Sequence, residues 1–328
     1  MGYNSTAKLQ FLVSNSPIDI ILPPFNSIAV QAAKQTVTIP VPTNWCYLWW
    51  SILFSGVGGN FVAAMIQEMR VKINGILLMQ ISGPQLDFIN QYYQYPAGTA
   101  PAGVATDFCM IIPFIRQSMK GANLWIDFTN KAFGQATIPD VEWETALNCG
   151  MPDPTTGTAI TQVILEMDLV NTNGAGITGI TSSNKAKVLP ASAGGPGALM
   201  FWNKTTFNAS NSTTNQLIGG NGLLYGDINH YYFDSLFMFP PTGTADNFQF
   251  WLNSQEILQR SAEENFFFQS LNAQRVPTLA TPAIDFCETG MADGVKYIAP
   301  QATSARLQFS YTVSEGLPLI QRCVGYLG

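Results

Sequence analysis

The chain has 328 residues, which is enough for two domains with cores of their own. Charged residues make up 11% of the chain and hydrophobic residues 47%, whereas an ordinary soluble domain has roughly 25% charged residues. So few charges indicate that other copies of the chain or a membrane cover much of the surface. The net charge of −6, without a basic stripe, argues against direct, sequence-specific nucleic-acid binding, because phosphate neutralisation needs clustered Lys and Arg.

Residues 1–30 read as an extended N-terminal arm. Pro17, Pro23 and Pro24 prevent a continuous helix, and the run IDIILPPF (18–25) is apolar. The arm has too few charges to be well solvated as a free tail. We expect it to lie along a neighbouring copy of the chain or near a lipid membrane or, alternatively, to add an edge strand to the domain that follows.

Residues 31–171 are predicted to form a first domain of short strands, most of them separated by turn-forming Pro, Gly and Asn. One short helix is expected at 84–94. The strand-like runs are 34–41, 46–54, 68–73, 76–81, 107–115, 123–128 and 160–170.

The uncharged segment 45–66 is long enough to cross a membrane as a helix. Gly56, Gly58 and Gly59 interrupt it, however, and its first half is aromatic and typical of a strand. The segment is therefore predicted to be a buried strand followed by a Gly-rich loop.

Residues 172–198 are rich in Gly, Ser and Ala, a composition typical of a linker. Residues 199–328 then form a second domain, with one clear helix at 261–273. The strands expected in this domain are 199–207, 214–218, 230–239, 247–252, 255–259, 284–288, 295–299 and 304–313.

The two domains share a repeated motif, MRVKINGILLMQISGPQLDFINQY at 69–92 and FQFWLNSQEILQRSAEENFFFQSL at 248–271. Each copy reads as strand, tight turn, strand and helix, with a serine as the N-cap of the helix. Aligning the two copies without a gap pairs Asn74 with Asn253 and Ser82 with Ser261.

Flanking matches in the same order support a duplication of the whole domain, among them Asp107-Phe108-Cys109 with Asp285-Phe286-Cys287. Each half then has seven or eight short antiparallel strands and one helix. The predicted fold class is all-β: two tandem eight-stranded antiparallel jelly rolls (β-sandwiches), each with a short helix.

No catalytic constellation is evident, and we expect neither a catalytic residue nor a cofactor. His230 is the only histidine, and it is predicted to be structural because it begins a strand. An acidic cluster is a weak metal candidate, since hard cations prefer several carboxylates. It lacks the spacing of a calcium loop, and a solvated strand face is the favoured interpretation. The cluster consists of Asp140, Glu142, Glu144 and Asp153.

The chain resembles the double jelly-roll major capsid proteins of icosahedral, membrane-containing bacteriophages, the tectivirus and corticovirus type. The resemblance rests on VKINGILLMQISGPQLDFINQYY (71–93), WLNSQEILQRSAEENFFFQSL (251–271), the tandem arrangement and the arm. It implies a homotrimer whose six jelly rolls form a pseudo-hexameric tile of the virion shell. It also implies contacts with neighbouring trimers, penton or minor capsid proteins and an internal virion membrane. Such a protein is made in the host cytoplasm and resides in the virion.

Two other classes of function are compatible with jelly rolls. A β-sandwich receptor- or carbohydrate-binding phage spike would expose Trp and Tyr on one loop face. A jelly-roll enzyme of the cupin type needs several His ligands on adjacent strands, and a single histidine argues strongly against it.

Overall fold

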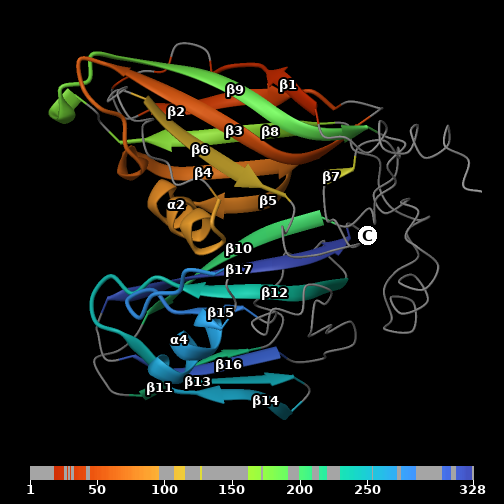
Figure 1. Cartoon of the computed structure of the whole chain (residues 1–328), viewed down its shortest axis with the longest axis vertical. Helices are drawn as coiled ribbons and strands as arrows, with labels where there is room; N and C mark the ends of the chain where they lie inside the picture. The colour runs from red at the N-terminus through yellow and green to blue at the C-terminus, as the bar shows by residue number, and fades with distance from the viewer. Residues whose placement is uncertain are drawn as a thin grey trace, which may run out of the picture.

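The structure, a computed structural model, contains two β-sandwiches, one above the other in Figure 1. We call the upper one roll 1 and the lower one roll 2. The residues that the structure describes are 18–25, 28, 30, 33–41, 45–95, 107–114, 126–127, 162–170, 173–190, 199–208, 214–219, 230–252, 254–271, 275–285, 305–311 and 315–326.

Roll 1 has one sheet with the strand order β1-β9-β3-β6, with β7 beside β3, and a facing sheet with the order β2-β8-β4-β5. Its strands are β1 (Ile18–Leu22), β2 (Ala33–Ile39), β3 (Trp45–Val57), β4 (Ile66–Ile73), β5 (Ile76–Ile81), β6 (Asp107–Pro113), β7 (Ile126–Asp127), β8 (Val163–Leu169) and β9 (Gly179–Pro190). Its helix is α2 (Gly83–Tyr92), and two 3₁₀ turns are η1 (Ala63–Met65) and η3 (Asn173–Ala175).

Roll 2 repeats this arrangement, with sheets of order β10-β17-β12-β15 and β11-β16-β13-β14. Its strands are β10 (Leu199–Asn208), β11 (Thr214–Gly219), β12 (His230–Met238), β13 (Ala245–Leu252), β14 (Gln255–Arg260), β15 (Ala283–Asp285), β16 (Ala305–Tyr311) and β17 (Gly316–Tyr326), and its helix is α4 (Ala262–Ser270). Apart from the short β7, the described strands of each roll thus form two sheets of four strands with the same strand order. The predicted fold class is confirmed.

The hairpins at the centre of the repeated motif have the same register. Ile73 pairs with Ile76 in roll 1, and Leu252 pairs with Gln255 in roll 2, so both loops hold two residues. These are the positions that the sequence alignment of the two copies equates.

A β-bulge also recurs at the same place in the two hairpins. The register shifts between Val71 and Lys72 in roll 1 and between Phe250 and Trp251 in roll 2. Since bulges are retained features that re-aim a strand, their recurrence supports a duplicated unit. Asn74 has a φ of +50°, which suits a two-residue hairpin turn. Asn253 lies outside the described residues.

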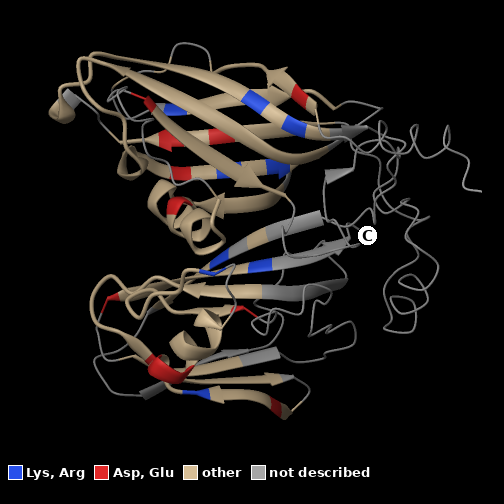
Figure 2. Ribbon diagram, viewed as in Figure 1, with Lys and Arg blue, Asp and Glu red and all other residues tan. Residues whose placement is uncertain are grey.

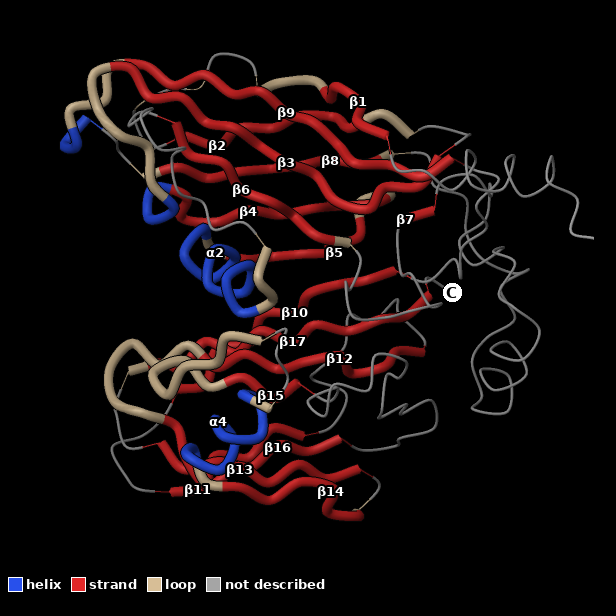
Figure 3. The backbone as a smooth tube through the Cα atoms, in the orientation of Figure 1, coloured by secondary structure: helices blue, strands red, loops and turns tan. Residues whose placement is uncertain are grey.

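Both helices begin with the predicted serine in a complete capping box. Ser82 Oγ accepts a hydrogen bond from Gln85 N at 3.4 Å, and Ser261 Oγ accepts one from Glu264 N at 3.1 Å. The side chains of Gln85 and Glu264 accept in turn from the serine amides. Each helix then lies along one side of its sandwich, where α2 contacts β4 and β6 and α4 contacts β15 and β13 (Figure 3).

Equivalent amide side chains tie each helix to the edge strand beside it. Asn90 Nδ2 donates to the carbonyl of Ile111 at 2.8 Å, and Gln269 Nε2 donates to that of Asp285 at 3.4 Å. Asp285 therefore takes the place of Ile111 in the repeat. The sequence match of Asp285 with Asp107 was wrong, because the shorter loop before β15 shifts the register.

The predicted linker at 172–198 is also wrong, because residues 179–190 form β9. This strand lies between β1 and β3 and pairs with both. Its core-facing positions, Ile180, Ala186 and Val188, are buried. Small and charged residues between them hid the alternation that marks a strand.

Part of the predicted N-terminal arm is an edge strand. Residues 18–22 form β1, which pairs with β9 in register from Ile18↔Val188 to Leu22↔Asn184. The alternative expectation therefore holds for this segment. Residues 1–17 lie outside the described part, so a contact between them and a neighbouring subunit stays a prediction.

The segment 45–66 contains strand β3 and a Gly-containing loop, as predicted. Within the described part of the chain, the structure has no helix that is long and apolar enough to span a membrane.

Candidate functional site: the contact between the two rolls

The edges of the two rolls meet in a single continuous sheet. Strand β5 of roll 1 lies parallel to β10 of roll 2, with Met79 opposite Trp202. This pairing joins four strands of each roll into one eight-stranded sheet. The rolls are therefore fixed to each other through the backbone as well as through side chains.

Helix α2 occupies the space between the rolls (Figure 1). Phe88 packs edge-on against Phe239 of roll 2, with ring centroids 5.6 Å apart, and Tyr92 packs edge-on against Phe237 at 5.2 Å. Such aromatic pairs stabilise a contact beyond the area that they bury. The helix of roll 1 thus acts as the main anchor on roll 2.

Tyr93, which follows α2, lies between two guanidinium groups of roll 2. The Cζ atom of Arg322 lies 4.3 Å from the centroid of the Tyr93 ring, and that of Arg275 lies 4.5 Å from it. The hydroxyl of Tyr93 also donates to Ser235 Oγ at 2.8 Å. A cation over the face of a desolvated aromatic ring is strongly attracted to that ring. Tyr93 therefore binds roll 2 through both its ring and its hydroxyl.

The two cations lie in the buried interior of the contact. Arg322 is 0% exposed on β17, and Arg275 donates from Nε to Asp285 Oδ2 at 2.5 Å. Val276, next to Arg275, donates its amide to the carbonyl of Tyr92 at 2.9 Å. Removing one member of a buried ion pair is costly, so the pair Arg275–Asp285 holds the roll 2 side of this contact in place.

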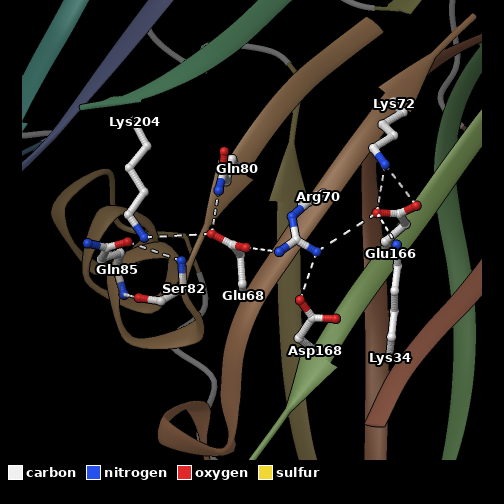
Figure 4. Close-up of polar contacts among 10 residues, drawn as sticks. All are labelled: Lys34, Glu68, Arg70, Lys72, Gln80, Ser82, Gln85, Glu166, Asp168 and Lys204. Carbon is white, nitrogen blue, oxygen red and sulfur yellow. Dashed lines mark hydrogen bonds and ion pairs between the residues drawn. The ribbon is translucent and has the colours of Figure 1, made fainter. Parts of the chain in front are cut away.

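Charged residues are numerous on the strands of roll 1 and few on the described strands of roll 2 (Figure 2). In the sheet β2-β8-β4-β5 they lie on the outer face, because the alternate positions Met69, Val71 and Leu165 face the core. Arg70 donates to Glu68 and, at 2.7 Å, to Asp168, and Gln80 donates to Glu68 at 2.6 Å (Figure 4). Lys204 of roll 2 reaches to within 3.9 Å of Glu68. This long ion pair between half-buried side chains crosses between the rolls.

Glu166, at the centre of the same face, pairs with Lys72 at 2.9 Å and Lys34 at 3.1 Å (Figure 4). Burial by itself raises the pKa of Glu166, but the hydrogen bonds and charges of the two lysines outweigh this effect. The net result is a pKa below the ordinary value, so the carboxylate is charged at neutral pH.

The predicted site residues fall outside this contact. Asp140, Glu142, Glu144 and Asp153 lie outside the described residues, so their role as a metal site stays a prediction. In the described ranges, no group of three or more His, Cys, Asp and Glu residues could hold a metal ion.

His230 is the first residue of β12, the strand start that the sequence predicts. Cys109 is a free thiol on β6, and burial raises its pKa.

Sequence reasoning did not identify the residues of the roll contact. One signal was present: Arg322 interrupts the apolar run of β17, and a lone arginine among apolar strand residues indicates a buried, paired cation. The pair Tyr92-Tyr93 at the end of the helix gave no such signal, because aromatic residues there most often belong to the core of their own domain.

The fold and this contact can be compared with known proteins. Residues 20–135 match the sequence model of the family described as viral coat protein P2 N-terminal domain. No curated protein sequence matches the chain.

Among solved structures, the major capsid protein P2 of bacteriophage PM2 superposes with a TM-score of 0.67 and 16% identity, over 95% of this chain and 98% of that protein. The capsid of the virus PBCV-1 superposes with a TM-score of 0.56 and 12% identity, over 95% of this chain and 93% of that chain. A chain from the structure of Sulfolobus Turreted Icosahedral Virus superposes with a TM-score of 0.57 and 12% identity, over 95% of this chain and 91% of that chain. The chain therefore has the fold of the double jelly-roll major capsid proteins, and the predicted resemblance is confirmed.

Proposed function

We propose that the chain is the major capsid protein of an icosahedral virus and that it forms pseudo-hexameric homotrimers. The observation that carries the proposal is the rigid contact between two equivalent rolls, made by α2, Tyr93 and the β5–β10 pairing. Three chains with two such rolls each provide six similar units for one tile. The match of residues 20–135 to a coat-protein domain supports the same function.

The finer features rest on the resemblance to capsid proteins of membrane-containing phages. In this proposal the trimers contact one another and penton or minor capsid proteins, and an internal membrane lies beneath them. The role is structural, so it requires no catalytic centre and no cofactor. The protein resides in the virion.

Electron microscopy of the protein expressed on its own and of particles from infected cells tests the function. We expect trimeric rings with six similar lobes and icosahedral particles in which this chain is the most abundant protein. Extraction of lipid from purified particles tests the internal membrane. A few copies per particle, located at the vertices, would instead identify a spike.

A further inference from the structure

Helix α4 presents an apolar face to solvent. Phe267 is 59% exposed and Leu271, directly after the helix, is 58% exposed, and both neighbours of Phe267 are exposed as well. Large apolar groups that cluster on a surface indicate an interaction site. The residues of its first turn, Glu263 and Glu264, add negative charge beside this face.

The internal repeat shows what such a face binds. Phe267 and Leu271 occupy the positions that Phe88 and Tyr92 hold in the first copy of the motif. In roll 1 these two positions make the aromatic contacts of α2 with roll 2. The same helix positions are therefore covered in roll 1 and uncovered in roll 2.

The receiving surface is repeated too. In roll 2 it is the outer face of the sheet β10-β17-β12-β15, where Ser235, Phe237, Ile320 and Arg322 are all fully buried. The corresponding outer face of the sheet β1-β9-β3-β6 in roll 1 is only half-buried or exposed. Its residues include Ser51, Leu53, Cys109, Ile111 and Lys185.

We infer that α4 of one copy docks on the outer face of the β1-β9-β3-β6 sheet of a second copy, as α2 docks on roll 2 within the chain. Phe267 and Leu271 then pack around the neighbour's Leu53. The exposed Lys185 on this face complements the acidic first turn of α4. This inference rests on the proposed function and specifies the surface through which the copies associate.

Strand edges support the same geometry. Strand β14, the equivalent of β5, and β1, the equivalent of β10, each end a sheet within the described part of the chain. Ile21 on β1 is 83% exposed. Edge strands are ready to pair, so β14 of one copy can lie beside β1 of the next, as β5 lies beside β10. The surfaces are different on the two partners, and a contact of this type generates a closed ring when the rotation between neighbouring copies closes after a whole number of copies.

Photo-crosslinking tests the docking directly. p-Benzoylphenylalanine is placed at Phe267 in the full chain, and at Phe88 as a matched control from the other repeat. The control should give a link within one chain, to residues near Phe239. The probe at 267 should give a link between two chains, mapped by mass spectrometry to β3 or β6 around Leu53. A link between chains that maps elsewhere would overturn the inference.

Surface variants give an independent test. Phe267→Ser with Leu271→Ser, and separately Leu53→Asp, should convert the oligomer to monomer in analytical ultracentrifugation, while circular dichroism shows an unchanged fold. Thr36→Asp with Thr38→Asp, on the exposed outer face of β2, is the control and should leave the oligomer intact.

The outcomes separate the inference from the function. If the wild-type protein is oligomeric and the α4 variant remains so, the docking surface is wrong while the capsid function stands. If the wild-type protein is monomeric and absent from particles, both are wrong.

Discussion

The hydroxyl of Tyr92 donates a buried hydrogen bond of 2.6 Å to Oε1 of Gln269, so the last turn of α2 contacts the last turn of α4. The two residues belong to equivalent helices of different rolls. The bond therefore couples the repeats at the place where their sequences diverge, because the equivalent of Tyr92 in roll 2 is the exposed Leu271.

Removing this hydroxyl should destabilise the contact between the rolls. For Tyr92→Phe we expect a loss of about 1–2 kcal/mol in the free energy of unfolding, because a buried acceptor loses its donor. Urea denaturation followed by tryptophan fluorescence measures the effect. Tyr311→Phe is the matched control, because it also removes a tyrosine hydroxyl, but one that binds the carbonyl of Thr242 within roll 2 and not across the contact between the rolls. An unchanged unfolding curve for Tyr92→Phe would contradict the role of this bond.

The buried pair Arg275–Asp285 should show strong coupling. Arg275→Leu is expected to cost about 3 kcal/mol or more, because it leaves the carboxylate of Asp285 without its cation in the interior. Adding Asp285→Leu should recover part of the loss. Arg70→Leu, on the half-exposed outer face, should cost less than about 1 kcal/mol. Additive effects of the two buried substitutions, measured in a double-mutant cycle, would contradict the prediction.

Gly83 should not tolerate a side chain. A Cβ atom there would overlap the carbonyl oxygen of Ala63 and lie 2.8 Å from Cβ of Ile66. Gly83→Ala should therefore cost about 1–3 kcal/mol through overpacking. Roll 2 has Ala262 at the equivalent position, and Ala262→Gly should cost about 1 kcal/mol or less. Thermal unfolding ranks the two variants. Equal shifts in melting temperature would contradict the prediction, because they would show that the N-termini of the two helices are packed alike.

Stability should fall on acidification in a way that depends on Glu166. Its pKa in the folded state is below the ordinary value of 4.5. The stabilisation that the charged carboxylate of Glu166 provides is therefore complete above the ordinary pKa. It is lost as the pH falls through the lower folded-state pKa. Glu166→Gln should flatten the decline of the unfolding free energy as the pH falls below 4.5. A decline as steep in Glu166→Gln as in the wild-type protein would contradict this prediction.

The sequence was most informative where a periodic pattern coincided with local signals. Ser82 and Ser261 could be recognised as helix caps because a serine followed three residues later by Gln or Glu satisfies two backbone amides. The hairpin at Asn74 was equally clear. The duplication then predicted an equivalent hairpin and helix in the second half, which the structure has as β13, β14 and α4.

The features that the sequence did not predict depend on contacts between residues far apart in the chain. Strand β9 is central in its sheet, yet Gly, Ser and Lys between its buried positions resemble a linker. In β17, Pro318 and Arg322 argue against a central strand, although both neighbours of this strand pair with it. The roll contact depends on Tyr93 meeting Arg275 and Arg322, which belong to the other half of the chain. No local pattern encodes such a meeting.

The presence of both rolls in one polypeptide affects how a shell could grow. Linked segments meet at effective concentrations on the order of millimolar, whatever the amount of protein in the cell. The contact around Tyr93 therefore forms during folding at a rate constant that does not depend on protein concentration. Every contact between copies, in contrast, forms more slowly when the protein is dilute. Each newly made chain brings two prealigned units, so in the proposed six-roll ring only half of the roll contacts have to form between separate copies.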